Sequence, residues 1–378
     1  MIVAKTETFA ILDELAYFQQ AYEHLKINYD PILYDINGPF KNDSQFEAEK
    51  NPNRRIRKRK RPVSSNHEME NDCLLVKEQH EKLLREGLTM GYFKEVAEKD
   101  NNRKAREKAK QIDCFFQASS SKVLEDYQLT DDDFVMIKES QSFYSNSLSQ
   151  AITINVGSDS SIEKCCIPGS SSFALGDISY IYRWKEEKQE TFDLIVMDPP
   201  WVNFSVKRTN NYKLDDHWHS SLPNMDMLSS RGLCCIWITN RKGIMNVVEA
   251  LLERWNLKIC SLWYWLKVTK EGKPVCEYQT DHKVPFERVV VACFADQLSY
   301  WKSKIADKFV CASIPMAVHS HKPPMALLLS SAGLEFEKSC ELFARGLLPK
   351  TVSVGLECLY MQRWCMYDKT QKGTTMTA

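Results

Sequence analysis

Short apolar runs alternate with an amphipathic segment in the second half of the chain. Residues 192–198, 232–239, 258–268 and 288–294 are apolar or β-branched runs, and residues 242–256 carry apolar positions at helical spacing. This alternation is typical of a mainly parallel sheet covered by helices. We therefore predict an α/β fold in which the four runs are strands. In such sheets, ligands bind outside the carboxyl ends of the strands.

The first part of the chain follows a different pattern. Residues 9–28 and 68–112 have apolar positions at helical spacing, which predicts helices. Residues 117–172 are rich in Ser and Asp and have no sustained period, which indicates a linker or a loosely packed region. We predict a helical, partly flexible N-terminal region at 1–172, with a basic linker and a Ser-rich linker. A second domain is predicted at 173–378.

The basic linker is the run RRIRKRKRP at residues 54–62, which has seven Lys or Arg in nine positions. Such a charge density opposes packing. The run is a solvated linker, a nuclear-localisation signal or an arm that binds phosphates. We expect a nuclear protein, with the cytoplasm as an additional location.

The overall charge is balanced, because fifty basic residues face fifty acidic residues and the formal net charge is zero. No general positive field attracts a polyanion, so any nucleic acid must bind to local patches. The thirteen cysteines include no Cys-x-x-Cys pair, which predicts reduced core thiols in an intracellular protein. No signal peptide is evident, and no apolar run approaches the roughly 20 residues that span a bilayer, so we expect a soluble protein.

Several common site patterns are missing from the sequence. It contains no G-x-S-x-G elbow, no His-Glu-x-x-His pair, no phosphate loop and no G-x-G-x-x-G motif. Histidines 217, 219, 319 and 321 are interpreted as loop residues rather than metal ligands, so no metal is expected.

The first strand run ends in an unusual tetrapeptide, Asp198-Pro199-Pro200-Trp201. Each proline fixes its own φ at about −65°, extends the residue before it and offers no N–H. What remains is an edge of acceptors, made by the Asp198 carboxylate and the Pro199 carbonyl, with an indole beside it. This edge suits a planar group with an NH₂ donor, such as the amino edge of a nucleobase. The alternative is a turn that ends a strand, with a core tryptophan.

The same edge favours a reaction at that amine. An aromatic amine is a poor nucleophile because its lone pair is delocalised into the ring. Acceptors that bind its two hydrogens favour a pyramidal nitrogen, and so they stabilise charge that develops only in the transition state.

These residues resemble the MT-A70 family, whose members methylate N6 of adenine with S-adenosylmethionine and carry Asp-Pro-Pro-Trp after a strand. The segments NFSVKRTNNY (203–212), HSHKPP (319–324) and CELFARGLLP (340–349) closely resemble one branch of that family. The likeness covers roughly residues 173–362. It implies a Rossmann-like methyltransferase fold in permuted order, in which the catalytic strand comes first and a later strand supplies cofactor contacts without a glycine-rich loop.

The resemblance also implies the residues of the site. Asp198, Pro199, Pro200 and Trp201 are the expected catalytic residues. The residues expected to hold S-adenosylmethionine are Asp177, Ile178, Lys322, Glu341, Phe343, Arg345 and Glu357. Those expected to contact the substrate are Asn203, Ser205, Lys207, Arg208, Asn210, Tyr212, His282, Lys283 and Glu287.

Several of these residues also have plain structural explanations. Asp177 precedes a helical turn and could be its N-cap. Lys322 could be a surface lysine near a helix start, and Glu341, Phe343 and Arg345 could simply end a strand. The loop at 282–287 is equally well explained as a hairpin connection.

Two positions depart from the family pattern. The family commonly has Gly-Asn-Glu or Gly-Asn-Gln where this chain has Gly355-Leu356-Glu357, and a leucine cannot hydrogen-bond a ribose hydroxyl. Gly346 stands where relatives often have Asn. We predict weaker cofactor binding than in relatives.

Three functions follow from the resemblance. The first is an RNA adenosine N6-methyltransferase, because the branch acts on the 2′-O-methylated adenosine of U2 small nuclear RNA. The second is a DNA N6-adenine methyltransferase, since both substrates present the same amino edge. The third is a catalytically silent nucleic-acid-binding subunit. No membrane association and no obligate protein partner are expected, and the protein is predicted to be a monomer.

Overall fold

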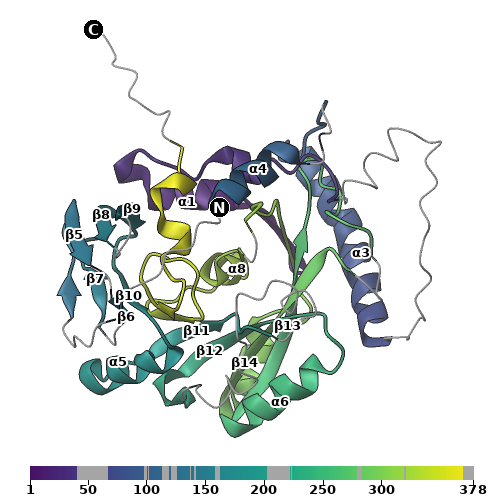
Figure 1. Ribbon diagram of the computed structural model, residues 1–378. Helices are drawn as coiled ribbons and strands as arrows, with labels where there is room; N and C mark the ends of the chain where they lie inside the picture. The colour runs from purple at the N-terminus through teal and green to yellow at the C-terminus, as the bar shows by residue number, and fades with distance from the viewer. Residues whose placement is uncertain are drawn as a thin grey trace.

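A large mixed sheet forms the centre of the molecule (Figure 1). The computed structural model describes residues 1–40, 67–97, 100, 102–112, 119–120, 126–136, 138–139, 142–157, 162–201, 222, 224–278, 283–318 and 321–368. Within these segments the sheet has 12 strands. Their order is β1 (Ile2–Lys5), β2 (Phe9–Leu12), β15 (Val310–Ser313), β13 (Leu257–Lys267), β14 (Phe286–Phe294), β12 (Leu228–Ile238), β11 (Phe192–Met197), β16 (Ser339–Leu342), β17 (Thr351–Gly355), β10 (Ser171–Leu175), β7 (Tyr144–Asn146) and β4 (Tyr127–Gln128).

The predicted strands and the α/β class are confirmed. The runs at 192–198, 232–239, 258–268 and 288–294 form β11, β12, β13 and β14. Five neighbouring strands, β12, β11, β16, β17 and β10, run parallel, as expected of a Rossmann-like methyltransferase fold. β13 and β14 form an antiparallel pair, so the connection between them is a hairpin.

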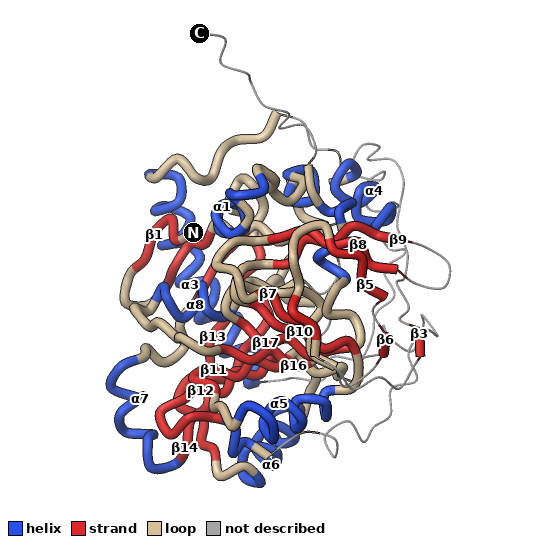
Figure 2. The backbone as a smooth tube through the Cα atoms, turned by 90° about the vertical axis from the view of Figure 1, so that its left-hand side faces the viewer, coloured by secondary structure: helices blue, strands red, loops and turns tan. Residues whose placement is uncertain are grey.

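β11 reads as a continuous apolar run because both of its faces are covered. Leu194 and Val196 point to one core cluster and Ile195 and Met197 to the other. α5 (Ile181–Lys188) and α6 (Ile244–Arg254) pack on the face of Ile195, whereas α7 (Leu298–Lys304) and α8 (Met325–Ser331) pack on the face of Leu194. The second view shows α5 and α6 together on one side of the strands (Figure 2).

The N-terminal segment is part of the same sheet. β2 pairs in parallel with β15, with Ala10 opposite Cys311. The prediction of a helix over 9–28 is wrong for residues 9–12, which are strand β2, because four consecutive apolar residues are buried on both faces. The helix α1 (Glu14–Ala21) begins after Asp13, whose carboxylate accepts the N–H of Ala16 at 2.9 Å and caps the helix.

The rest of the N-terminal region is also helical in part. Short 3₁₀ turns lie at η1 (Glu23–Leu25) and η2 (Pro31–Tyr34). The predicted helical region 68–112 contains α3 (His67–Thr89), which packs on β13 and β15 on the same face of the sheet as α6, and α4 (Arg103–Ile112). The basic run at 54–62 lies outside the described residues.

The prediction of a Ser-rich linker over 117–172 is wrong for 142–157 and 162–172, which form packed strands. β8 (Ile152–Gly157) and β9 (Ile162–Ile167) pair with each other and, with β5 (Asp133–Met136), make a small sheet. Its apolar residues pack against those of β7 and β10. Polar residues here satisfy one another, since the hydroxyls of Ser145 and Ser172 lie 2.8 Å apart. β3 (Ser119–Ser120) and β6 (Lys138–Glu139) form a separate two-stranded sheet.

Strands from both sides of the predicted boundary at 172/173 share the central sheet. The division of the chain into two domains stays a prediction. Every cysteine in the described segments is a free thiol, and all but Cys276 and Cys365 are buried, which confirms the prediction of core thiols there. No helix in those segments is long and apolar enough to cross a membrane.

Candidate active site

The site lies at the edge where the parallel strands end. β11, β16 and β10 stop at this edge, and Asp198, Phe343 and Asp177 lie one or two residues beyond them. β14 runs in the opposite direction, so it places Glu287, near its start, at the same edge. Chain geometry thus brings together residues from 177 to 343, as expected for ligand sites in parallel sheets.

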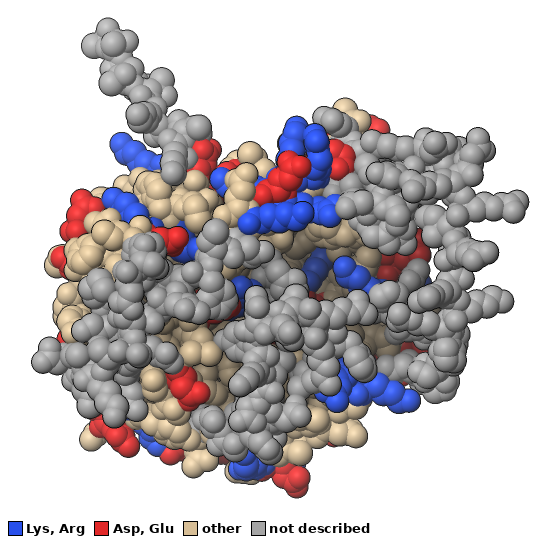
Figure 3. Space-filling view, viewed as in Figure 1, with Lys and Arg blue, Asp and Glu red and all other residues tan. Residues whose placement is uncertain are grey.

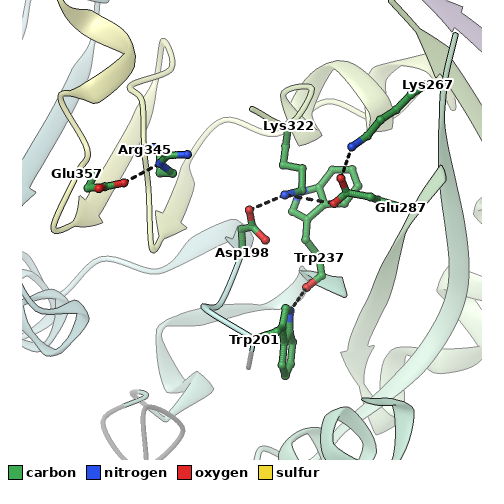
Figure 4. Close-up of polar contacts among 8 residues, drawn as sticks. All are labelled: Asp198, Trp201, Trp237, Lys267, Glu287, Lys322, Arg345 and Glu357. Atoms are coloured by element: carbon green, nitrogen blue, oxygen red, sulfur yellow. Dashed lines mark hydrogen bonds and ion pairs between the residues drawn. The ribbon is translucent and has the colours of Figure 1, made fainter. Parts of the chain in front are cut away.

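A chain of alternating charges begins at Asp198 (Figure 4). The Lys322 ammonium lies 2.7 Å from Asp198 Oδ2 and 3.3 Å from Glu287 Oε2. Glu287 also pairs with Lys267, the last residue of β13. The Lys322 side chain is only 14% exposed and its ammonium lies 5.9 Å from the ring centroid of Trp237. Lys322 is therefore a buried bridge between two carboxylates rather than a surface lysine.

These groups change one another's acidity. Burial raises the pKa of Asp198, and the positive charge of Lys322 opposes that rise. Burial would also raise the pKa of Glu287, but Lys267 and Lys322 outweigh it and lower that pKa to about 2. Burial acts to lower the pKa of Lys322, yet Asp198 and Glu287 outweigh it and raise the pKa well above its ordinary value. Lys322 thus stays charged and favours an ionised Asp198.

Trp201 is a core residue beneath this network. Its side chain is buried, and its Nε1 donates to the Trp237 carbonyl at 2.7 Å. Its backbone N–H donates to the Pro199 carbonyl, also at 2.7 Å, so the tetrapeptide makes a tight turn. A carbonyl oxygen has two lone pairs, and Pro199 therefore keeps the capacity to accept a second donor. Trp201 forms part of the wall that supports the turn.

An open cleft lies beside Asp198. Lys322, Glu341, Phe343 and Arg345, four of the residues predicted to hold the cofactor, line it. Burial, followed by the charge of Asp198, raises the pKa of Glu341 to about 7. The cleft therefore presents cations and carboxylates side by side.

A strained turn shapes one end of the cleft. Phe343 has φ 61°, in the left-handed region that bulky residues rarely adopt. Beyond this turn Arg345 Nε donates to Glu357 Oε2 at 2.7 Å, and the guanidinium lies 4.5 Å from the ring centroid of Tyr360. Glu357 thus joins the site through Arg345, although it does not itself line the cleft.

Asp177 and Ile178, like Glu357, do not line this cleft. The Asp177 carboxylate accepts the N–H of Ser179 at 2.8 Å, which is the N-cap alternative, and Ile178 is buried in the core. Both lie at the edge where β10 ends.

The predicted substrate residues are only partly described. Glu287 belongs to the charged network, whereas Lys283 is exposed and its ammonium lies 6.0 Å from the ring centroid of Phe40. The remaining ones, Asn203, Ser205, Lys207, Arg208, Asn210, Tyr212 and His282, lie outside the described residues.

Sequence reasoning missed Lys267, His321 and two aromatic residues from the N-terminal segment, Phe18 and Tyr29, that line the cleft. Lys267 could have been found, because it is the polar residue that ends an apolar strand run, the same signal that identified Asp198. His321 was interpreted as a loop residue, and it does lie in a loop, but it lines the cleft beside Lys322. Nothing in the local sequence indicates that Phe18 or Tyr29 reaches this edge.

Several known proteins are similar to this chain in sequence. The MT-A70 family model matches residues 192–357. The "DNA N6-methyl methyltransferase" of Caenorhabditis elegans is 35% identical over 368 residues, which are 94% of this chain and 96% of that protein. The human "N(6)-adenine-specific methyltransferase METTL4" is 32% identical over 262 residues, 67% of this chain and 53% of that protein, so the match spans about half of the human protein.

A fungal relative carries a different substrate in its name. The "N6-methyladenosine RNA methyltransferase MTA1" of Cryphonectria parasitica is 29% identical over 212 residues, 53% of this chain and 62% of that protein.

Proposed function

Because the chain belongs to the MT-A70 family of adenine N6-methyltransferases, we propose that it methylates RNA at the 2′-O-methylated adenosine of U2 small nuclear RNA. The family membership itself makes the chain an N6-adenine methyltransferase that acts on nucleic acid. The RNA target is supported by the segments at 203–212, 319–324 and 340–349, which resemble the methyltransferase-like protein 4 branch, and by the likeness to a fungal RNA methyltransferase.

One observation carries the chemistry: Asp198 ends a buried parallel strand, borders a cleft and is held by the ammonium of Lys322. We propose that its carboxylate and the Pro199 carbonyl accept the two hydrogens of the adenine amine. These contacts strengthen as the nitrogen becomes pyramidal and gains positive charge, so they act on the transition state more than on the ground state. Pro200 limits the freedom of the turn, and Trp201 supports it from the core.

The cleft fits S-adenosylmethionine, which the family generally uses. The cofactor carries a carboxylate, an ammonium and ribose hydroxyls. The cleft offers the cation of Lys322 and the carboxylate of Glu341, to which no described group donates a hydrogen bond. Phe343 and Arg345 would border the cofactor, and Glu357 would hold Arg345 in place. When bound, the cofactor supplies a methyl group on a sulfonium, and the chain's own residues orient the amine toward it.

Basic side chains lie near the middle of one face. Figure 3 shows Lys and Arg within and around a central hollow, whereas acidic and basic residues are mixed elsewhere on that face. α4, at the top of this view, exposes Arg103, Lys104 and Lys110. Such local patches attract phosphates even though the net charge is zero. They support a polynucleotide substrate.

A DNA substrate is the second candidate, and the name of the Caenorhabditis elegans relative favours it. The two candidates differ at the sugar, so the test compares three matched single-stranded oligonucleotides: RNA with adenosine, RNA with 2′-O-methyladenosine, and DNA. Methyl transfer from labelled S-adenosylmethionine should be fastest to the 2′-O-methylated RNA. Faster transfer to DNA would establish the second candidate, and equal transfer to both RNAs would exclude the U2 adenosine as the specific target.

We also propose that the protein is nuclear and monomeric. The basic run at 54–62 supports nuclear import, and replacing its Lys and Arg residues by Ala in a fluorescent fusion should move the protein to the cytoplasm. An unchanged nuclear signal would contradict this role of the run. Light scattering of the purified chain checks the monomer.

Leu356 is a site where cofactor affinity should increase. It is 49% exposed beside Glu357, where the family commonly has Asn. Leu356→Asn should tighten S-adenosylmethionine binding about two- to tenfold, the worth of one net hydrogen bond, and calorimetry measures it. Leu148→Asn, at a leucine 54% exposed and outside the cleft lining, is the matched control. Unchanged affinity in Leu356→Asn would show that this departure does not weaken the site.

Unlike Leu356, Gly346 has no room for the Asn that relatives often have. A Cβ atom at this position would lie 3.0 Å from Met361 Cβ, closer than ordinary contact. An Asn side chain here requires the backbone or Met361 to move. The glycine thus belongs to the packing between the cleft and the C-terminal 3₁₀ turn η8 (Tyr360–Gln362).

A further inference from the structure

A buried chain of polar groups runs behind Lys322. Trp265 Nε1 lies 2.7 Å from the hydroxyl oxygen of Ser313, and Ser313 is hydrogen-bonded to Glu14 Oε1. The other oxygen, Glu14 Oε2, lies 3.4 Å from Nδ1 of His321, the residue before Lys322. The Glu14 side chain is fully buried and that of His321 is 7% exposed. The chain therefore connects the first turn of α1 to the loop that carries Lys322.

The indole of Trp265, at one end of this chain, fixes the direction of the hydrogen bonds. An indole N–H can only donate, so Ser313 accepts from Trp265 and gives its own hydrogen to Glu14. Glu14 Oε2 and His321 Nδ1 are left facing each other, and neither atom has a hydrogen-bond partner in the described part of the chain. Buried polar groups without partners are costly. A single proton between these two atoms satisfies both.

We propose that Glu14 is a positioning residue of the methyl-transfer site: through one shared proton it orients His321, and through the adjoining backbone it holds the Lys322 ammonium against Asp198. The proposal rests on methyl transfer at this cleft and not on the identity of the polynucleotide. It gives the N-terminal segment a role in the site, next to Phe18, whose ring centroid lies 6.0 Å from that of His321.

The position of the shared proton decides which tautomer His321 adopts. With a protonated Glu14, Nδ1 accepts and the ring hydrogen sits on Nε2. With an ionised Glu14, Nδ1 must donate and Nε2 becomes an acceptor. Since Nδ1 is buried and His321 lines the cleft, Nε2 is the nitrogen left to the cleft. Glu14 thus sets whether the ring offers the cleft a donor or an acceptor.

Glu14 can be protonated or ionised near neutral pH, so both tautomers of His321 are accessible. Burial raises the pKa of Glu14 to about 7, against the hydrogen bond from Ser313. Burial, followed by the charge of Lys322, lowers the pKa of His321 to about 3, so the ring itself stays neutral. The groups that face Glu14 or sense its charge are Asp13, the Met1 ammonium, Lys267, Ser313, His321, Tyr34 and Tyr92.

Two substitutions separate positioning from simple packing. In Glu14→Gln the amide oxygen accepts from Ser313 and the NH₂ group donates to His321, so the variant imitates the protonated state at every pH. Glu14→Leu has a similar volume but leaves His321 Nδ1 and the hydroxyl hydrogen of Ser313 without a partner. We expect Glu14→Gln to bind S-adenosylmethionine about as well as the wild type at pH 6. Glu14→Leu should bind it about tenfold more weakly.

The decisive readout is the ¹⁵N spectrum of the His321 ring in the full-length protein. The wild type should change from the Nε2–H to the Nδ1–H tautomer as the pH rises through about 7, whereas Glu14→Gln should remain Nε2–H throughout. Glu23→Gln, at an exposed glutamate of η1, is the control and should behave as the wild type.

Two outcomes would overturn the proposal. One is a His321 tautomer that follows pH identically in the wild type and in Glu14→Gln. The other is wild-type cofactor affinity in a folded Glu14→Leu protein. If Glu14→Leu does not fold, the tautomer measurement on Glu14→Gln still decides. Neither readout uses a polynucleotide, so a wrong assignment of the RNA target would leave both results interpretable.

Discussion

Asp198→Asn is expected to lower the rate of methyl transfer by about a hundred- to a thousandfold, the usual cost of losing one preorganised group that acts on the transition state. The asparagine keeps the volume of the side chain. It loses the negative charge, however, and replaces one acceptor oxygen by an NH₂ group that opposes the adenine amine. Single-turnover transfer from labelled S-adenosylmethionine measures the effect, and thermal unfolding checks that the fold is retained.

Asp193→Asn is the matched control, because Asp193 lies on the same strand as the tetrapeptide, near the strand's other end. Asp193 accepts a hydrogen bond from the Ser229 hydroxyl at 3.1 Å, which an Asn carbonyl also accepts. The variant should therefore leave the rate within about twofold. The pH profile gives a second check. Because burial raises the pKa of Asp198, wild-type activity should fall as acid protonates it, and Asp198→Asn should lose that acidic limb. A variant that kept half of the wild-type rate would remove Asp198 from the mechanism.

Lys322→Met should be the second most damaging change. It removes the cation shared by Asp198 and Glu287, and truncating one partner of a buried hydrogen-bonded charge pair costs about 2–5 kcal/mol. We expect kcat/KM to fall at least about thirtyfold, with weaker cofactor binding by calorimetry. The acidic limb of the pH profile should also move to higher pH, since the ammonium no longer opposes the rise in the Asp198 pKa.

Lys338→Met provides the comparison for Lys322. Lys338 forms an ion pair with Glu190 at 2.9 Å, but its side chain is 51% exposed. Exposed ion pairs contribute about 0–1 kcal/mol, so this variant should act almost as the wild type. Equal losses in both lysine variants would mean that a general loss of positive charge, and not the bridge at Asp198, explains the result.

Local pattern was enough to predict β11 and β14, two of the strands whose ends form the site. The apolar run that forms β11 and the two prolines after it located Asp198 at a strand end before any contact was known. Local pattern failed at residues 9–12, because a short apolar run fits a strand and a buried helix equally well. The strand that pairs with these residues, β15, lies some 300 residues away in the sequence. Ser145 and Ser172 misled for a related reason, since each has its hydrogen-bond partner on the neighbouring strand.

Local sequence predicted site residues only where they directly follow a strand. Lys322 and Asp198 are 124 positions apart, so their ion pair depends on the fold and on no local signal. For Asp177 the local sequence was ambiguous, because the same short motif fits an N-cap and a cofactor ligand. The structure shows the N-cap hydrogen bond. The family resemblance supplied the remaining residues, and the charged network explains why Glu287 belongs with them.

The pairing of β2 with β15 has a consequence for how the protein is made. Phe9 in β2 cannot pair until its partner Val310 has been synthesised. The Tyr29 hydroxyl donates to the carbonyl of Met361, which is synthesised later than Val310. Contacts between such distant positions close slowly, because the intervening chain must first lose much of its conformational freedom. One wall of the cleft is therefore completed only after Met361 has been synthesised, and a partial chain that ends before this residue lacks that wall.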